Sequence, residues 1–363
     1  MRKSLIISVL AVFVLFSLSL VGCSSKEKLY VLNWGKYMNP DLIDKFETEN
    51  NVKVVYEEVG SNEEMEIKLK QGITDYDIMI PSEYMIDKLS QEDLLLPINY
   101  SLLTNLEEVD FFEDAKVLYE NEDFGQYLIP YFFGTVGIMY NTSNPNVKTA
   151  LESDNGGFCT LFDVNNDFRV ALYDSPRDTI GAALMCLGYS VNSNNDAELG
   201  EAEDLIEAAL AKSLGSIRFG QDDLKGDVAK GNLDLALVYS GDYFEMVFEY
   251  EAEETDIEFD YFAPNHTNIW IDAFVIPNTS KNTDLAHKFI NFFLDLDNAA
   301  ENADWVGYTP VISEVYNVMV NDYGYDYDHY YPQPEGSSRE VFMYLGSEHA
   351  QKLNTILNAV RIS

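Results

Sequence analysis

Cysteine, histidine and basic residues are scarce in this chain of 363 residues. It has three cysteines and four scattered histidines, so no spacing typical of a metal site is present. Lysine and arginine together number 23, against 62 aspartates and glutamates, which gives a formal net charge of −39 at pH 7. A polyanion of this kind is unsuited to nucleic acid and suited to attracting cations. We therefore predict no cofactor, no metal and no nucleic-acid partner.

Two of the three cysteines, Cys159 and Cys186, lie in the body of the chain. They could form a disulfide in an oxidising compartment. Cys186 belongs to an apolar run, 182–187, that is typical of a buried helix. The sequence therefore favours two free thiols over a disulfide.

Long apolar runs are absent except at the N-terminus. Residues 5–20 are apolar apart from three serines, follow a basic start, and lead into small residues and Cys23. This pattern is typical of a secretory signal, and its end resembles the lipobox of bacterial lipoproteins, in which the cysteine carries the lipid. An uncleaved membrane anchor is the alternative, but the run is short for a span. We predict a signal peptide over 1–22, lipidation of Cys23 and a linker over 23–28.

Short strands alternate with helices along the rest of the chain. Helix starts are marked by Asn39-Pro40 and by Ser61-Asn62-Glu63-Glu64, which has the spacing of a capping box. This order is typical of an α/β fold with a mostly parallel sheet, in which ligands bind outside the carboxyl ends of the strands. We expect strands at 29–34, 51–59, 76–81, 168–174, 233–239, 257–264 and 268–277, and helices at 197–214, 283–295 and 347–360.

The length of the exported part, roughly 340 residues, is sufficient for two lobes with separate cores. Extended segments at 127–141 and 268–277 are predicted to cross between the lobes, which would create a hinged cleft. We predict that one lobe contains 29–137 and 271–316, and the other 138–270 and 317–363.

Trp270 and Asp272 stand two residues apart on the predicted strand 268–277, so alternation places them on one face. We expect an exposed indole there, which together with a carboxylate suits an organic cation through cation–π attraction and a charge-assisted hydrogen bond. A core tryptophan beside a turn-capping aspartate is the alternative. Asp178, at the start of another predicted helix, could likewise be an ordinary helix-start acid.

Five motifs occur in order over nearly the whole exported chain: Asn33-Trp34-Gly35-Lys36-Tyr37, Pro81-Ser82-Glu83-Tyr84, Leu187-Gly188-Tyr189-Ser190, Trp270-Ile271-Asp272 and Gly307-Tyr308-Thr309-Pro310. Together they resemble the spermidine/putrescine-binding proteins of polyamine ABC transporters. The resemblance implies a type II periplasmic-binding-protein-like fold, with a mixed sheet and flanking helices in each lobe and the ligand cleft at the hinge. It further implies a lipid-anchored monomer, outside the cytoplasmic membrane, that delivers a polyamine to permease subunits.

The resemblance also implies a set of ligand-binding residues. Seven match the family in residue type: Trp34, Tyr37, Ser82, Tyr84, Trp270, Asp272 and Tyr308. Asp178 replaces a glutamate and Tyr239 a tryptophan. Departures are Gly35, which lacks a hydroxyl, Gln221 in place of a serine, and Ser175 in place of a second acid, for which the preceding Asp174 could substitute. An amide expected near Phe342 has no clear counterpart, so the sequence does not rank spermidine against putrescine.

Some residues also fit functions other than polyamine binding. Tyr330-Tyr331 resembles the paired tyrosines of ferric-iron receptors, and receptors for sugars or quaternary amines also use aromatic side chains. A hydrolase could use Asp174 and Asp178 as a carboxylate pair, but no nucleophile elbow or paired histidine supports an enzyme. The acidic stretch 322–331 lacks the spacing of an EF-hand, and we expect a solvated loop there.

Overall fold

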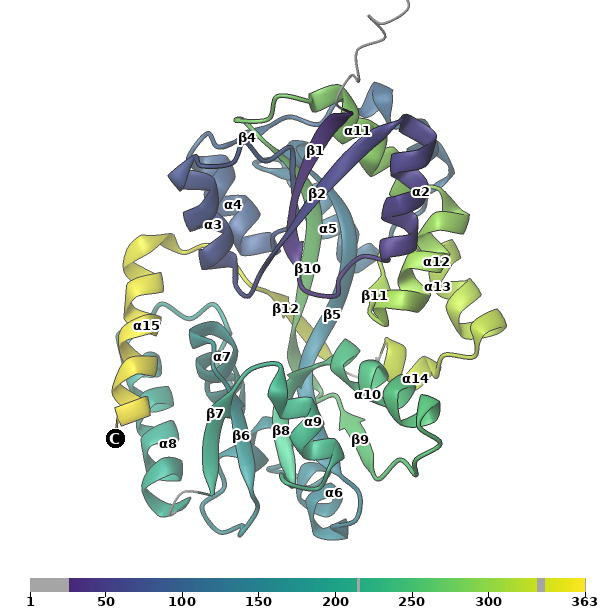
Figure 1. Cartoon of the computed structure of the whole chain (residues 1–363). Helices are drawn as coiled ribbons and strands as arrows, with labels where there is room; N and C mark the ends of the chain where they lie inside the picture. Colours follow the sequence, from purple (N-terminus) through teal and green to yellow (C-terminus); the bar gives the residue numbers. More distant parts are fainter. Residues whose placement is uncertain (1–25, 214–215, 332–336, 363) are drawn as a thin grey trace, which may run out of the picture.

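Two long antiparallel strands, β5 (Leu128–Asn141) and β10 (His266–Pro277), run through the whole molecule (Figure 1). The computed structural model describes residues 26–213, 216–331 and 337–362, so the predicted signal peptide and Cys23 lie outside the described residues. Every residue of β5 is buried, as expected for a strand covered on both faces. No helix among the described residues has the length and apolar character needed to cross a membrane.

Both long strands belong to one sheet with the strand order β2-β1-β3-β10-β5-β8-β6-β7. The first three strands are parallel to one another, as are β8, β6 and β7, while β10 and β5 pair antiparallel. β4 and β12 also pair with β10, and β9 and β11 with β5. The other strands are β1 (Glu27–Trp34), β2 (Val52–Val59), β3 (Ile78–Met79), β4 (Leu95–Leu96), β6 (Val170–Tyr173), β7 (Ile217–Gly220), β8 (Leu235–Tyr239), β9 (Phe259–Phe262), β11 (Thr309–Pro310) and β12 (Ser338–Val341).

Helices flank the sheet in each of two lobes (Figure 1). The upper lobe in that view carries α2 (Pro40–Asn50), α3 (Asn62–Gln71), α4 (Glu83–Gln91), α5 (Glu113–Tyr119), α11 (Thr283–Phe293), α12 (Leu296–Val306) and α13 (Ser313–Val318). The lower lobe carries α6 (Pro145–Leu151), α7 (Pro176–Cys186), α8 (Asp196–Ser213), α9 (Asp223–Ala229), α10 (Ser240–Ala252), α14 (Tyr327–Tyr330) and α15 (Gly346–Ile362). The predicted α/β architecture is therefore confirmed.

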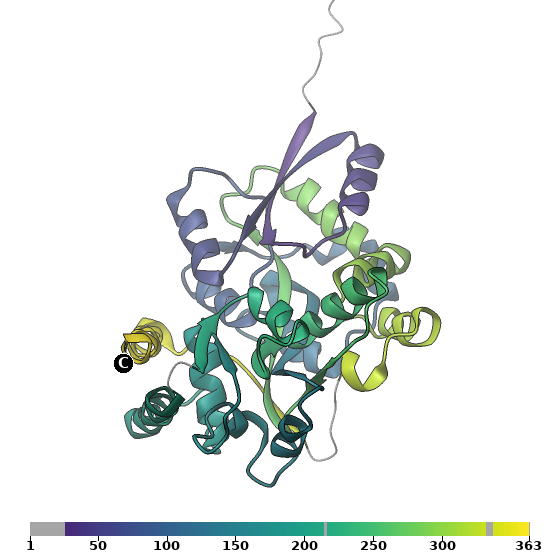
Figure 2. The same ribbon diagram turned by 60° about the horizontal axis from the view of Figure 1, so that its bottom comes forward.

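The passage of β5 between the lobes is visible in its pairing. Leu128 to Thr135 pair with β10, and Val136 to Tyr140 pair with β8 of the lower lobe. The lobe boundaries inferred from the sequence stay a prediction. The C-terminal helix α15 lies beside α8 in both views and packs on α7 and α8 (Figures 1 and 2).

Two helix starts formed as the sequence predicts. The Asn39 side chain accepts a hydrogen bond from the Asp41 amide, and Pro40 occupies the first helical position of α2. The Ser61 hydroxyl accepts from the Glu64 amide at the start of α3. These caps depend on neighbouring residues alone, which is why the sequence was sufficient to find them.

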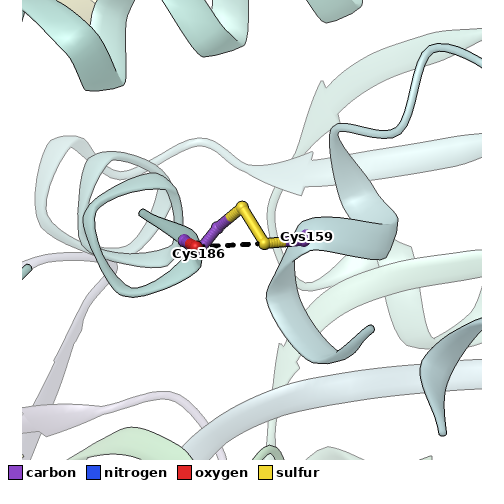
Figure 3. Close-up of a disulfide and its surroundings, with 2 residues drawn as sticks. All are labelled: Cys159 and Cys186. Atoms are coloured by element: carbon purple, nitrogen blue, oxygen red, sulfur yellow. Dashed lines mark hydrogen bonds between the residues drawn. A yellow bond between two sulfur atoms is a disulfide. The ribbon is translucent and has the colours of Figure 1, made fainter. Parts of the chain in front are cut away.

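The expectation of free thiols was wrong, because Cys159 and Cys186 form a disulfide with an S–S distance of 2.07 Å (Figure 3). Cys186 is the last residue of α7 rather than a residue of its interior, and it is only half-buried. It faces the short 3-10 helix Gly157–Leu161, which carries Cys159. The bond therefore joins the end of α7 to the segment that precedes β6.

The prediction of a solvated loop over 322–331 was wrong for Tyr325, Tyr330 and Tyr331, which are buried, whereas Tyr323 is exposed. A π-helical turn (Met319–Tyr323) and α14 form there, and Tyr325 and Tyr330 are buried. Their ring centroids lie 4.6 Å apart, and Tyr325 also packs on Phe244 of α10 at 5.2 Å. The apolar area of the rings outweighs the solvation of the neighbouring aspartates, of which Asp322 and Asp328 remain exposed.

Candidate functional site

Two glycines admit large rings to the region where the lobes meet. Gly134 on β5 stands opposite Trp270 on β10, and a Cβ there would lie 2.5 Å from the indole Cζ2. A Cβ on Gly241, near the start of α10, would lie 2.3 Å from the ring of Tyr308. Both distances are shorter than atoms can approach, so only glycine leaves these rings in place.

Five aromatic side chains form a connected group, which we call the aromatic cluster: Tyr37, Tyr173, Tyr239, Trp270 and Tyr308. The Trp270 ring lies 5.9 Å from Tyr239 and 5.2 Å from Tyr308, both edge to face. Tyr308 contacts Tyr37 at 5.7 Å, and Tyr239 contacts Tyr173 at 5.0 Å. Rings from both lobes thus meet around one indole. The expectation of an exposed Trp270 was wrong, since only 8% of it is exposed.

Asp272 is buried beside this cluster. It lies on the regular part of the β5–β10 ladder, before a bulge, so alternation puts it on the same face as Trp270. The Ser82 hydroxyl donates to its Oδ1 at 2.6 Å and accepts in turn from Asn62. Burial raises the pKa of Asp272 to about 7, opposed by the hydroxyls of Ser82 and Tyr37. In the described part of the chain, no lysine or arginine forms an ion pair with it.

Asp178, a second buried carboxylate, stands in the first turn of α7. The Tyr239 hydroxyl donates to its Oδ2 at 3.0 Å, and its backbone amide donates to Ser175, the N-cap, at 3.4 Å. Burial raises the pKa of Asp178, and its contacts with Ser175 and Tyr239 oppose the rise. Asp178 therefore stands at a helix start, where an acid is ordinary, and also contacts the aromatic cluster.

Several polar atoms around the cluster lack a hydrogen bond to any described residue. Among them are Glu83 Oε1 and Trp270 Nε1, both buried. A buried polar atom without a partner costs about 1–3 kcal/mol, so such atoms are rare in a folded core. Their gathering near two carboxylates and several rings is typical of a ligand-binding site rather than of a packed interior.

Glu83 was not among the predicted site residues. It is 1% exposed, and its Oε2 accepts from the backbone amide of Ile271, between Trp270 and Asp272. Burial raises the pKa of Glu83 to about 8, so it is mostly uncharged at pH 7. Its place directly after Ser82, at the start of a helix beside a strand end, is the sequence signal that could have found it.

Asp242 was also missed. Its Oδ1 accepts from the Tyr308 hydroxyl at 3.3 Å, and its Oδ2 accepts from the Tyr239 amide at 2.9 Å. Lys225 of α9 lies against the same carboxylate at 3.2 Å. A strand ending in Ser240-Gly241-Asp242 was visible in the sequence, but nothing local indicated that a lysine would reach it.

Other predicted site residues have different surroundings. Tyr84 donates to Glu63, and the Arg177 guanidinium lies 3.9 Å above its ring, which attaches it to the neighbourhood of Asp178. Trp34 is the last residue of β1 and Gly35 follows it, and the nearest atom to a Cβ on Gly35 would belong to Glu58.

Asp174 and Gln221 have partners outside the cluster. Asp174 forms an ion pair with Arg361 of α15, which accounts for its charge. Gln221 is exposed, and its backbone amide donates a hydrogen bond to Asp223 Oδ1. Phe342, near which an amide was expected, is buried against Gly181 of α7.

The features proposed for other functions have partners of their own. The Tyr330 hydroxyl donates to the Tyr308 carbonyl, and the Tyr331 hydroxyl donates to Asp114, so both are engaged within the described fold. The two aspartates of the hydrolase hypothesis pair with different groups, Asp174 with Arg361 and Asp178 with Tyr239. The two tyrosines are therefore not free to bind iron together, and the two aspartates do not act as one carboxylate pair.

Comparison with known proteins agrees with this geometry. The model of the family described as bacterial extracellular solute-binding protein matches residues 41–324. The putrescine-binding periplasmic protein SpuD of Pseudomonas aeruginosa is 31% identical over 79% of this chain and 80% of its own. The spermidine/putrescine-binding periplasmic protein of Salmonella typhimurium is 30% identical over 80% and 79% of the two chains.

Solved structures give the same result. The putative spermidine/putrescine ABC transporter from Listeria monocytogenes superposes with a TM-score of 0.79 at 34% identity, covering 93% of this chain and 99% of that one. The substrate-binding protein PotD from Streptococcus pneumoniae gives 0.74 at 32%, with 93% and 99% covered. The predicted periplasmic-binding-protein-like fold is confirmed, and the chain belongs to the family of bacterial extracellular solute-binding proteins.

Proposed function

We propose that this chain binds a polyamine, spermidine or putrescine, outside the cytoplasm and delivers it to the permease subunits of an ABC importer. The observation that carries the proposal is Asp272, a buried carboxylate beside the aromatic cluster that has no lysine or arginine paired with it in the described residues. An isolated buried anion is costly, and an organic cation would offset that cost. The names of the relatives from Pseudomonas aeruginosa and Salmonella typhimurium support the same ligand class.

The chemistry of a polyamine suits both parts of the site. Its methylene segments would lie against Trp270, Tyr239 and Tyr37, where each ammonium over a ring face gains about 0.5–2 kcal/mol. Its ammonium groups would meet Asp272 and Asp178, each in a charge-assisted hydrogen bond. We propose that Trp34, Gly35, Ser82, Tyr84, Ser175 and Tyr308 line or adjoin the same site, and that Asp174 and Gln221 do not.

Ligand binding would favour the closed arrangement of the lobes. Carboxylates without partners are better solvated when the lobes are apart, and a bound cation removes that preference. We propose that the closed form is the one presented to the permease, and that the protein acts by binding rather than by catalysis. A signal peptide, a lipid on Cys23 and a monomeric state complete the proposal for its place at the outer face of the membrane.

Calorimetry of the purified protein tests this function. Putrescine, spermidine, glycine betaine and maltose are titrated separately at pH 7.5. Binding of a polyamine with micromolar or lower Kd, and no heat with maltose or glycine betaine, is the expected result. Binding of one of the other two solutes, with no heat from either polyamine, would refute the proposal.

A further inference from the structure

Lys225 places a positive charge of the protein itself at one end of the site. It lies on α9, and only 8% of its side chain is exposed. Its Nζ is 3.2 Å from Asp242 Oδ1 and 2.7 Å from Glu245 Oε2, and it also contacts Asp222. Burial alone would lower the pKa of Lys225, but Asp242 and Glu245 outweigh burial and raise it above its ordinary value. The group is therefore an ammonium at neutral pH.

The carboxylate that holds this ammonium is part of the aromatic cluster's surroundings. Asp242 accepts from the Tyr308 hydroxyl at 3.3 Å and from the Tyr239 amide at 2.9 Å. Tyr239 in turn donates through its hydroxyl to Asp178. A single tyrosine thus links Asp242, which has an internal cation, to Asp178, which has none among the described ion pairs.

The lysine side chain has the chemistry of a polyamine arm. Four methylenes ending in an ammonium are what one aminobutyl segment of a polyamine would offer to the same carboxylates. The carboxylate oxygens of Asp222, Asp242 and Glu245 lie within 4.8 Å of one another, a spacing suited to enclosing a single cation. Lys225 supplies that cation from within the chain.

The remaining charges limit how many ligand cations the site can hold. Asp178 and Asp272 are buried without an ion pair in the described residues, while Glu83 is mostly uncharged at pH 7. The Arg177 guanidinium lies over the ring of Tyr84 and forms no ion pair with either aspartate in the described residues. Asp178 and Asp272 are therefore left for cations of a ligand, because Asp242 already has the Lys225 ammonium as its partner.

We propose that Lys225 is a specificity-determining residue, a built-in ammonium that fills the acidic end of the site and favours ligands with two cationic groups over ligands with three or more. The inference rests on the proposed polyamine function and adds a preference for diamines to it. A third ammonium that approached Asp242 would meet the like charge of Lys225 instead of a free carboxylate.

The test compares Kd values for putrescine, spermidine and spermine in the wild-type protein and two variants. Lys225→Met keeps the length of the side chain and removes its charge, and Lys225→Arg keeps the charge. We expect the wild type to bind putrescine most tightly. In Lys225→Met, the ratio of the spermidine Kd to the putrescine Kd should fall by about tenfold or more, the usual effect of one added charge-assisted contact. Lys225→Arg should keep the wild-type ratio.

Lys68→Met is the matched control. Lys68 also pairs with two carboxylates, Glu57 and Glu64, but it lies on α3 and contacts none of the aromatic cluster in the described structure. Its loss should leave the ratio of Kd values unchanged. A change as large as that of Lys225→Met would show that net charge alone sets the preference, and would overturn the role of Lys225.

Chemical rescue covers the case in which Lys225→Met does not fold. Lys225→Ala removes the equivalent of propylammonium, so propylamine at millimolar concentration should raise its melting temperature, and propanol should not. Rescue supports an ammonium held at this place, and its absence overturns it. An unchanged Kd ratio in a folded Lys225→Met protein refutes the diamine preference alone, whereas a wild-type protein that binds no polyamine refutes the proposed function.

Discussion

Neutralising Asp272 separates binding from folding. Asp272→Asn keeps the shape of the side chain and an oxygen that can accept from Ser82, but it removes the charge. Loss of one charge from a buried, hydrogen-bonded ion pair costs about 2–5 kcal/mol. Since 1.4 kcal/mol is a factor of ten, the Kd for a polyamine should rise by roughly 30-fold at the lower end of that range and by roughly 4,000-fold at the upper end.

The effect on stability should have the opposite sign. Burial raises the pKa of Asp272 from 3.8 to about 7. A pKa difference of one unit between the folded and the unfolded chain corresponds to about 1.4 kcal/mol. The unfolded chain ionises Asp272 near pH 4 and the folded chain only near pH 7. Its favourable contribution is therefore fully present below pH 4 and is lost as the pH rises to 7, at most roughly 4 kcal/mol in the ligand-free protein. Asparagine does not titrate, so the variant should lack this loss.

Two measurements check the expected loss of polyamine binding and the expected change in stability with pH. Calorimetry at pH 7.5 gives the Kd, and urea unfolding of the ligand-free proteins at pH 5 and pH 8 gives the free energy of unfolding. The wild type should lose more stability than the variant when the pH is raised from 5 to 8. A variant that binds polyamine as tightly as the wild type would show that the Asp272 carboxylate does not bind an ammonium group of the ligand. A variant that unfolds more easily at pH 8 would contradict the argument from burial.

Three further changes test other features. Gly134→Ala should push Trp270 aside, destabilise the fold by about 1–3 kcal/mol and weaken polyamine binding about tenfold, as measured by melting and calorimetry. Reduction of the Cys159–Cys186 disulfide, which spans 27 residues, should lower stability by about 3–4 kcal/mol in urea unfolding. Asp174→Asn should cost at most about 1 kcal/mol, because its ion pair with α15 is partly exposed, and should leave the polyamine Kd within about twofold.

Each of these changes has a control or an opposing result. Gly200→Ala on α8, where a Cβ would meet nothing within 4 Å, should stabilise the protein by up to about 1 kcal/mol without affecting binding. Unfolding at equal urea with and without reductant would argue that the disulfide does not constrain the chain. A tenfold loss of binding in Asp174→Asn would restore that residue to the ligand site.

Local features were predictable from the sequence because their partners are close in the chain. Asn39 and Ser61 cap helices through amides two and three residues ahead. The common face of Trp270 and Asp272 follows from strand alternation alone. The resemblance added the expected fold, which the comparisons confirm, and the proposed ligand class, both of which depend on motifs rather than on contacts.

Features that join distant segments were not predictable. The disulfide depends on where α7 ends and on what faces that end, so an apolar pattern around Cys186 pointed to a free thiol. The burial of Trp270 depends on Gly134 and on Tyr308, which are remote in sequence. The contact of Lys225 with Asp242 required α9 and the start of α10 to lie together.

The residue pattern alone predicts most of the order of strands and helices, the helix caps and the residues from which a cation site could be made. Which aspartate has which partner depends on the folded chain. Asp174 pairs with Arg361 and Asp242 with Lys225, whereas Asp272 contacts a serine and stays without an ion pair in the described chain. The physical reason is that identical carboxylates differ only in burial and in neighbouring charge, and both are set by side chains that folding brings from far along the chain.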